Sequence, residues 1–300
     1  MRRAGSISAA AAAASLLAAA RVASAQPDGA NLFLSWCKAN ATVSAWPICD
    51  PTQALDVRSA DLVSRLSVAD KIAALYGGQW GKYAPGMGGP AFPSVGIAAG
   101  YNWWSEAAHG VWFVHWNDQI PYASNAVLPI TSSCSFNRSL WSATGNQIGR
   151  EGRAFTNIQE GDSTFWAPVI NIVRDPRWGR NLETAGEDPF LSGEYAVHWV
   201  KGFQTAKEAP YPLQASSCCK HFVANELDGW NHTDRDHIDV YVPQQDLADS
   251  YLPSFQACVE EGKVTGIMCS CGFKSAARRD EKQLASRPAC GRMKARSRCA

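Results

Sequence analysis

The sequence lacks three patterns that would each fix a class of protein. No run beyond the amino-terminal segment approaches the roughly 18 apolar residues of a membrane-spanning helix, so we expect no membrane partner. No glycine-rich phosphate fingerprint occurs, and we expect no nucleotide or other cofactor. No C-x-x-C pair occurs, and neither His109 with His115 nor His232 with His237 has a third ligand at helical spacing, so no metal is expected.

The amino terminus has the pattern of a secretory signal peptide. Arg2 and Arg3 form a positive start, residues 9–20 form a short apolar core, and residues 23–25 are small, as a cleavage site requires. We therefore predict a signal peptide over residues 1–25 and a secreted chain, located outside the cell or in a cell wall.

Export would place the ten cysteines in an oxidising compartment. Cys37 and Cys49, twelve residues apart, are plausible disulfide partners, although connectivity cannot be deduced from sequence. Sequons at Asn40, Asn137 and Asn231 are candidate glycosylation sites, and each could also occur by chance.

Charge is distributed unevenly along the chain. Residues 272–300 contain nine Lys or Arg against two acidic residues, a net charge of +7, and the remainder carries −6. This segment has no apolar periodicity, which is typical of a shifted or mis-spliced reading frame, and the alternative is a basic arm for nucleic acid. We favour the first interpretation, and we expect a disordered, non-homologous tail and no nucleic-acid partner.

Between these ends, apolar patterning predicts alternating strands and helices. The run from Phe165 to Ile172 lacks helical periodicity, as expected of a strand buried on both faces. Such units, about 35 to 50 residues each, favour parallel strand pairing, and the missing phosphate fingerprint favours a barrel. Ser67 and Asp70 predict a helix N-cap with an acidic first turn. The other expected strands span residues 126–131, 213–223 and 264–270, the helices span 59–76, 139–155, 188–204 and 244–261, and residues 76–93 are expected to form a loop.

The character of the chain changes abruptly after Ile172. Six charged residues come within fourteen positions, interrupted by proline and glycine: Arg174, Asp175, Arg177, Arg180, Glu183 and Glu187. Loops at the carboxyl ends of barrel strands commonly form the binding site. The alternative, from composition alone, is a solvated loop whose arginines and carboxylates pair with one another.

Two further clusters are expected at the same end of a barrel. Trp103 and Trp104 lie near Glu106, and a carboxylate beside aromatic faces suits a sugar, although adjacent tryptophans are more often core residues. Lys220 and His221 lie towards the end of an expected strand, where either one alone would be weak evidence. Three clusters that follow three strands favour a shared binding site.

Three segments carry a closer resemblance. They read YNWWSEAAHGV from Tyr101, FWAPVINIVRDPRWGRNLETAGEDPFLSGEYAVHWVKGFQ from Phe165, and KHFVANELDGW from Lys220. In this order they resemble the amino-terminal barrel of family 3 glycoside hydrolases, over residues 48–269, and most nearly the secreted β-xylosidases of plants and fungi. The resemblance implies an α/β fold, an incomplete TIM-type (β/α)8 barrel over residues 26–271, and retaining hydrolysis that releases xylose from xylo-oligosaccharides or xylan ends.

The resemblance also implies roles for four residues. Glu106, Arg180, Lys220 and His221 would hold hydroxyls of the terminal sugar. Relatives that cleave glucosides tend to carry the shorter Asp at the position of Glu106, so Glu favours a pentose, with β-glucosidase and α-L-arabinofuranosidase specificities as alternatives. The other charges of the central loop are expected to pair internally: Arg174, Asp175 and Arg177.

The sequence departs from the family pattern where the chemistry should be. The nucleophilic Asp is expected in a Ser-Asp segment a few tens of residues beyond residue 270, but residues 272–300 contain none, and Asp280 follows no apolar strand. The acid/base Glu of the family's second domain is also missing. We therefore expect no catalytic residue and no turnover in these 300 residues. The alternative is a carbohydrate-binding protein that has lost catalysis altogether.

Overall fold

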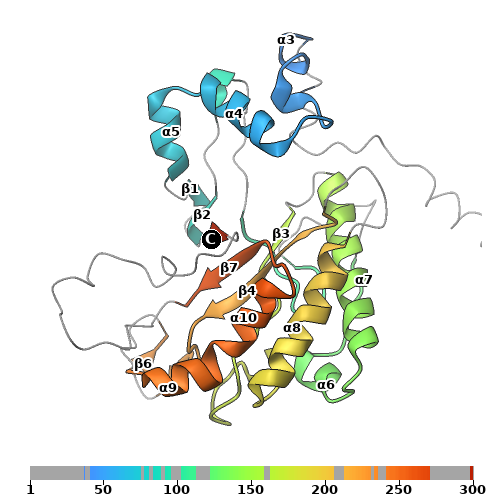
Figure 1. Ribbon diagram of the computed structural model, residues 1–300, viewed down its shortest axis with the longest axis vertical. Coiled ribbons are helices and arrows are strands. Elements are labelled where there is room, and N and C mark those ends of the chain that lie inside the picture. Colours follow the sequence, from blue (N-terminus) through green and yellow to red (C-terminus); the bar gives the residue numbers. More distant parts are fainter. Residues whose placement is uncertain are drawn as a thin grey trace, which may run out of the picture.

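The computed structural model describes most of the chain between residues 41 and 270 (Figure 1). The predicted signal peptide, residues 272–297 of the basic segment, and the sequons at Asn40 and Asn231 lie outside the described residues. Those residues are 37, 41–75, 78–80, 84–88, 92–95, 103–112, 122–158, 163–205, 213–230, 233–235, 241–270 and 298–299.

A parallel β-sheet lies at the centre of the fold, as the alternating pattern predicts. Each neighbouring pair of its strands is parallel. An isolated parallel bridge between Ser105 and Phe165 brings one more segment to the edge of the sheet. The segments around residues 105, 165 and 220 therefore lie side by side. The strand order is β3 (Thr164–Phe165), β4 (Ser216–Phe222), β7 (Gly266–Cys269) and β8 (Arg298–Cys299).

Three helices pack beside the sheet: α7 (Arg138–Asn157), α8 (Pro189–Gln204) and α10 (Pro253–Glu260). Helix α8 lies between the other two (Figure 1). Local sequence sets where the first two begin. Asn137 caps α7 and Asp188 caps α8, each by accepting a backbone N–H three residues further on, at 3.1 and 2.6 Å. The predicted helices over 139–155 and 188–204 are confirmed.

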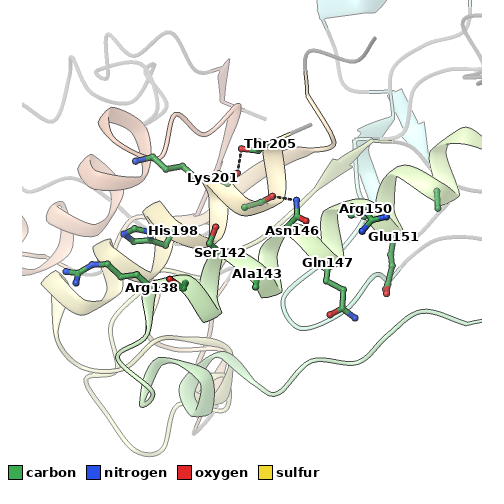
Figure 2. Close-up of a pocket in the computed structure, with 13 residues that line it drawn as sticks. Arg138, Ser142, Ala143, Asn146, Gln147, Arg150, Glu151, His198, Lys201 and Thr205 are labelled. Carbon is green, nitrogen blue, oxygen red and sulfur yellow. Dashed lines mark hydrogen bonds between the residues drawn. The ribbon is translucent and has the colours of Figure 1, made fainter. Parts of the chain in front are cut away.

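Helices α7 and α8 cross closely and leave a cleft between their exposed faces. A Cβ atom added to Gly202 of α8 would lie 2.0 Å from the carbonyl oxygen of Ser142 on α7, so the crossing requires glycine there. Asn146 donates from Nδ2 to the carbonyl oxygen of Gly202 at 3.2 Å (Figure 2). The cleft has a volume of about 1010 Å³ and polar side chains from both helices line it, His198 among them.

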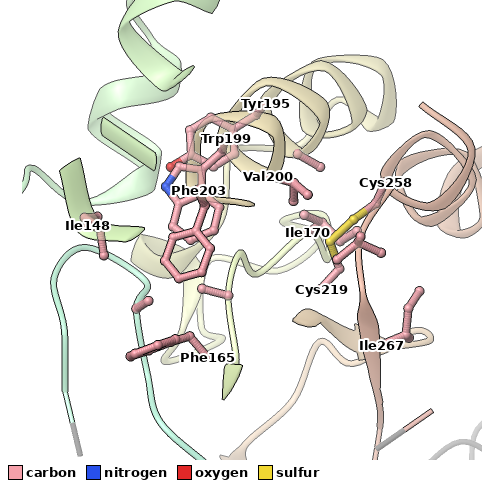
Figure 3. Close-up of a cluster of buried hydrophobic side chains, with 14 of the residues drawn as sticks. Ile148, Phe165, Ile170, Tyr195, Trp199, Val200, Phe203, Cys219, Cys258 and Ile267 are labelled. Atoms are coloured by element: carbon pink, nitrogen blue, oxygen red, sulfur yellow. A yellow bond between two sulfur atoms is a disulfide. The ribbon is translucent and has the colours of Figure 1, made fainter. Parts of the chain in front are cut away.

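The hydrophobic core lies between these helices and the sheet (Figure 3). Trp199 stacks on Phe203 with ring centroids 4.7 Å apart. A disulfide joins Cys219 of β4 to Cys258 of α10, a pairing that becomes apparent only when strand and helix are packed together. The predicted disulfide between Cys37 and Cys49 is confirmed. The largest buried side chains include Phe155, Phe165, Tyr195, Trp199, Phe203 and Phe255.

Two strand predictions need correction, and proline is the reason in both. The strand predicted over residues 126–131 is wrong, because Pro129 is the first residue of α6 (Pro129–Ser133) and its fixed φ favours a helix start. The strand predicted from Phe165 to Ile172 is short. Strand β3 ends at Phe165, and beyond Pro168, which has no N–H for a ladder, only an isolated bridge between Val169 and Lys220 continues the pairing. The predicted strands over 213–223 and 264–270 are confirmed as β4 and β7.

Two predicted helices are divided. The one over residues 59–76 is broken near Ser67, which caps the second piece by accepting the N–H of Asp70 at 3.1 Å, as predicted. The one over 244–261 is broken before Pro253. The predicted loop over 76–93 holds an antiparallel pair of strands. The elements concerned are α4 (Leu55–Arg65), α5 (Val68–Leu75), α9 (Gln244–Asp246), the π-helix η4 (Leu247–Tyr251), β1 (Gly78–Trp80) and β2 (Ala84–Gly88). Shorter elements are α3 (Ala41–Ser44) and the 3-10 helices η1 (Pro47–Cys49) and η2 (Pro93–Val95).

Candidate functional site

Glu106 and Lys220 form a largely buried ion pair near the carboxyl end of β4. The Nζ atom of Lys220 lies 2.6 Å from Oε2 of Glu106, and the lysine side chain is 3% exposed. The indole N–H of Trp104 donates to the other carboxylate oxygen at 3.1 Å. Trp104 in turn stacks on Trp166, with ring centroids 5.8 Å apart. Both oxygens of Glu106 are thus engaged, and an aromatic surface lies beside them, as the sequence predicts.

Arg180 is held by a two-pronged contact with a neighbouring carboxylate. Its Nε and NH2 atoms donate to the two oxygens of Glu183, which lies in the 3-10 helix η3 (Asn181–Glu183), at 2.8 and 2.7 Å. A second carboxylate, on Asp228, lies 3.7 Å from the NH1 atom of Arg180. Burial opposes the charge of Arg180, but the hydrogen bonds and charge of Glu183, with Asp228 adding to them, hold its pKa above the ordinary value.

His221 connects Arg180 to the sheet. The NH1 atom of Arg180 lies 3.2 Å from Nε2 of His221, and because a guanidinium can only donate, Nε2 must accept. The ring proton is therefore on Nδ1, which lies 3.2 Å from Oδ1 of Asn171. Asn171 also accepts the backbone N–H of His221 and donates to its carbonyl oxygen, at 2.8 and 2.9 Å.

The environment of His221 keeps its ring neutral. Burial lowers the pKa of His221 well below its ordinary value, and the positive charges of Lys220, Arg180 and Arg235 lower it further. Asn171 is a polar residue in an otherwise apolar run, and that contrast is the one sequence signal that could have identified it. Neither Asn171 nor Asp228 is among the site residues predicted from the sequence.

Of the three loop residues predicted to pair internally, two do so and one does not. Arg177 forms an ion pair with Asp175 and lowers the pKa of that carboxyl to about 2, mainly by hydrogen bonding. The prediction for Arg174 is wrong, because its NH1 atom donates to the hydroxyl of Tyr251 at 3.2 Å. That hydroxyl donates to Oε2 of Glu226, also at 3.2 Å. Burial raises the pKa of Glu226 to about 7 and that of Tyr251 to about 12.

The structure thus brings the four predicted sugar-binding residues together in two linked pairs. The cleft between α7 and α8 is a separate feature, and none of the four residues lines it. Asn137 is exposed but its side chain caps α7, and its glycosylation stays a prediction. In the part of the chain that the structure describes, no three His, Cys, Asp or Glu side chains are grouped as a metal site would need. None of the described helices is long and apolar enough to cross a membrane.

Comparison with known proteins identifies the family. Residues 124–291, a range that reaches into the basic segment, match the glycosyl hydrolase family 3 N terminal domain. The chain belongs to glycosyl hydrolase family 3. Among curated members, a beta-xylosidase/alpha-L-arabinofuranosidase of Medicago sativa subsp. varia is 40% identical over 236 residues, covering 77% of this chain and 29% of that protein. Beta-D-xylosidase 1 of Arabidopsis thaliana is 40% identical over 247 residues, covering 81% and 29%.

Solved family 3 structures share the fold. An exo-beta-xylosidase in complex with a xylobiose aziridine probe matches with a TM-score of 0.69 and 29% identity, over 79% of this chain and 30% of that one. Beta-glucosidase 3B from Thermotoga neapolitana matches with a TM-score of 0.58 and 27% identity, over 71% and 29%. The predicted α/β fold, a partial (β/α)8 barrel, is therefore confirmed. The chain spans less than a third of the length of these family 3 relatives.

Proposed function

We propose that this chain forms the part of a family 3 β-xylosidase site that holds the terminal xylose of a xylo-oligosaccharide. The observation that carries the proposal is the convergence of Glu106, Lys220, Arg180 and His221 from three segments distant in the sequence. Arg and Lys donate charge-assisted hydrogen bonds to hydroxyls, and a carboxylate accepts them. The curated relatives named as β-xylosidases support xylose as the sugar.

The length of Glu106 supports a pentose over a hexose. One oxygen of its carboxylate pairs with the buried Lys220 ammonium, and the other accepts the indole N–H of Trp104. These two contacts fix the position of the carboxylate. A Glu reaches one methylene further than the Asp that the resemblance associates with glucosides, and it would occupy space that a hydroxymethyl arm needs. Glucoside and arabinofuranoside specificity are the alternatives within the same chemistry.

Hydrolysis needs groups beyond those that the described residues place here. Retaining glycosidases use two carboxyl groups about 5 Å apart, one as nucleophile and one as acid/base. Both carboxylate oxygens of Glu106 are engaged, one by an ammonium and one by an indole. Both oxygens of Glu183 bind the Arg180 guanidinium. The two oxygens of Asp228 accept from an indole and from a guanidinium. These carboxylates therefore suit binding. We propose that the 300-residue chain binds its sugar without turnover, and that it is exported by residues 1–25.

Calorimetric titration with xylose and with glucose tests the proposal. We expect weak binding that favours xylose, and we expect Glu106→Asp to shift the preference towards glucose by freeing one methylene of space. A matched control is Glu194→Asp, the same change in an ion pair with Arg138 between α7 and α8, which should leave both affinities unchanged. Tighter binding of glucose than xylose by the unaltered chain would contradict the pentose proposal. Release of nitrophenol from nitrophenyl xyloside would show that a nucleophile has been missed.

A further inference from the structure

Asp228 joins three segments around the proposed sugar site, and the function proposed above gives it no role. Its Oδ2 atom accepts the indole N–H of Trp178 at 2.6 Å. Its Oδ1 atom accepts from NH1 of Arg235 at 2.9 Å and lies 3.7 Å from NH1 of Arg180. Trp178 and Arg180 belong to the charged loop, residues 174–187. Arg235 follows the second strand of a hairpin.

That hairpin is closed on Asp228 by the backbone as well. It consists of β5 (Gly229–Trp230) and β6 (Thr233–Asp234), which pair antiparallel directly after Asp228. The backbone N–H of Arg235 donates to the carbonyl oxygen of Asp228 at 3.1 Å. Asp228 therefore connects the hairpin to the charged loop, which it contacts at Trp178 and approaches at Arg180.

The same carboxylate restricts how the Arg180 guanidinium can turn. Glu183 contacts its Nε and NH2 atoms, and NH1 lies between His221 at 3.2 Å and Asp228 at 3.7 Å. The Arg180 and Asp228 side chains are only 19% and 21% exposed, so water screens their attraction less than it screens a surface pair. The contact with Glu183 fixes the plane of the guanidinium, and the charge of Asp228 adds an attraction on NH1 that keeps this end beside His221.

We propose that Asp228 is a positioning residue for Arg180: it holds the NH1 end of the guanidinium against His221 and ties the charged loop to the β5–β6 hairpin. This role rests on the proposed function, in which Arg180 contacts a sugar hydroxyl. It adds a requirement that the four sugar-binding residues do not contain, namely a carboxylate that never touches the sugar but sets the direction of one of its donors.

Asp228→Asn tests the role with a nearly isosteric change. The amide oxygen can still accept from Trp178 or Arg235, but the negative charge that attracts Arg180 is lost. We expect xylose binding to weaken about three- to tenfold, less than the full loss of one charge-assisted hydrogen bond, because Arg180 keeps its two contacts with Glu183. We also expect the ¹⁵N NMR signal of His221 Nε2 to move towards that of a ring nitrogen that accepts no hydrogen bond. Arg180→Met, which removes the donor itself, should move that signal in the same direction.

The matched control is Asp175→Asn, the same change in the same loop. Asp175 pairs with exposed Arg177, so neither xylose affinity nor the His221 signal should change. If Asp228→Asn fails to fold, Asp228→Glu keeps the charge one methylene further out and should give a partial shift of the His221 signal. An unchanged His221 signal in every Asp228 variant that folds overturns the positioning role. Absence of xylose binding by the unaltered chain overturns the proposed function alone, because the NMR signal is read without sugar.

Discussion

Neutralising Glu106 should cost the fold far more than neutralising a surface carboxylate. Among the described residues Glu106 is the only carboxylate within 4.0 Å of the Lys220 ammonium, and that lysine side chain is 3% exposed. Breaking a buried pair typically costs about 3–5 kcal/mol, because the remaining charge stays away from water. Glu106 is 22% exposed and Glu106→Gln keeps a neutral oxygen near the ammonium, so we expect the lower end, about 3 kcal/mol.

A double-mutant cycle isolates this pair. Lys220→Met removes the charge at similar length, and in Glu106→Gln/Lys220→Met neither charge is left unpaired, so part of the loss should be recovered. We expect a coupling energy of about 2 kcal/mol from guanidinium chloride unfolding followed by tryptophan fluorescence. The control cycle is Arg138→Met with Glu194→Gln, where the arginine is 56% exposed, and its coupling should stay below about 1 kcal/mol. A coupling for Glu106 and Lys220 no larger than the control would refute the reasoning.

Two further predictions concern packing and pH. Gly202→Ala should destabilise the chain by about 2–3 kcal/mol, because the new Cβ would lie 2.0 Å from a backbone oxygen, while Gly179→Ala, with nothing within 4 Å, should stay within about 0.5 kcal/mol. Equal unfolding midpoints would contradict the close crossing. Glu226 has a pKa raised from 4.5 to about 7, so the fold favours its protonated form and stability should fall as pH rises through that window. Partial exposure limits the loss to about 1–2 kcal/mol, and urea unfolding should show Glu226→Gln equal to the unaltered chain near pH 4.5 and more stable near pH 8. Parallel pH curves would contradict it.

The parts of the fold that the sequence predicts are those with local causes. Helices α7 and α8 carry apolar stripes and begin at Asn137 and Asp188, whose side chains satisfy backbone donors wherever the helix later packs. The failures came where one residue overrode a pattern. Pro129 turns an apolar run into a helix start, and Pro168 interrupts a strand that is buried as expected. A pattern of apolar residues alone does not predict either effect of proline.

The candidate site was predictable to the level of which segments meet, but not of which atoms bond. Strand-end reasoning places Glu106, Lys220 and the charged loop together, because parallel strands share one edge for their carboxyl ends. The partners of Arg180 were not predictable in this way. Glu183 contacts it through a 3-10 turn, and Asp228 approaches from a segment 48 positions further along the sequence. Such contacts depend on side-chain geometry that residue spacing does not specify.

A change of pH should affect the stability of the fold and the proposed sugar site through different residues. Burial raises the pKa of Glu226 to about 7, and its hydrogen-bond partner is Tyr251, which accepts from Arg174. His221, by contrast, has a pKa held well below its ordinary value by burial and by neighbouring cations, so its ring stays neutral while Glu226 changes state. The accepting lone pair on Nε2 of His221, which fixes Arg180, is therefore retained as the pH falls from 8 towards 6. Mild acid should accordingly make the fold more stable and leave the Arg180–His221 contact unaltered.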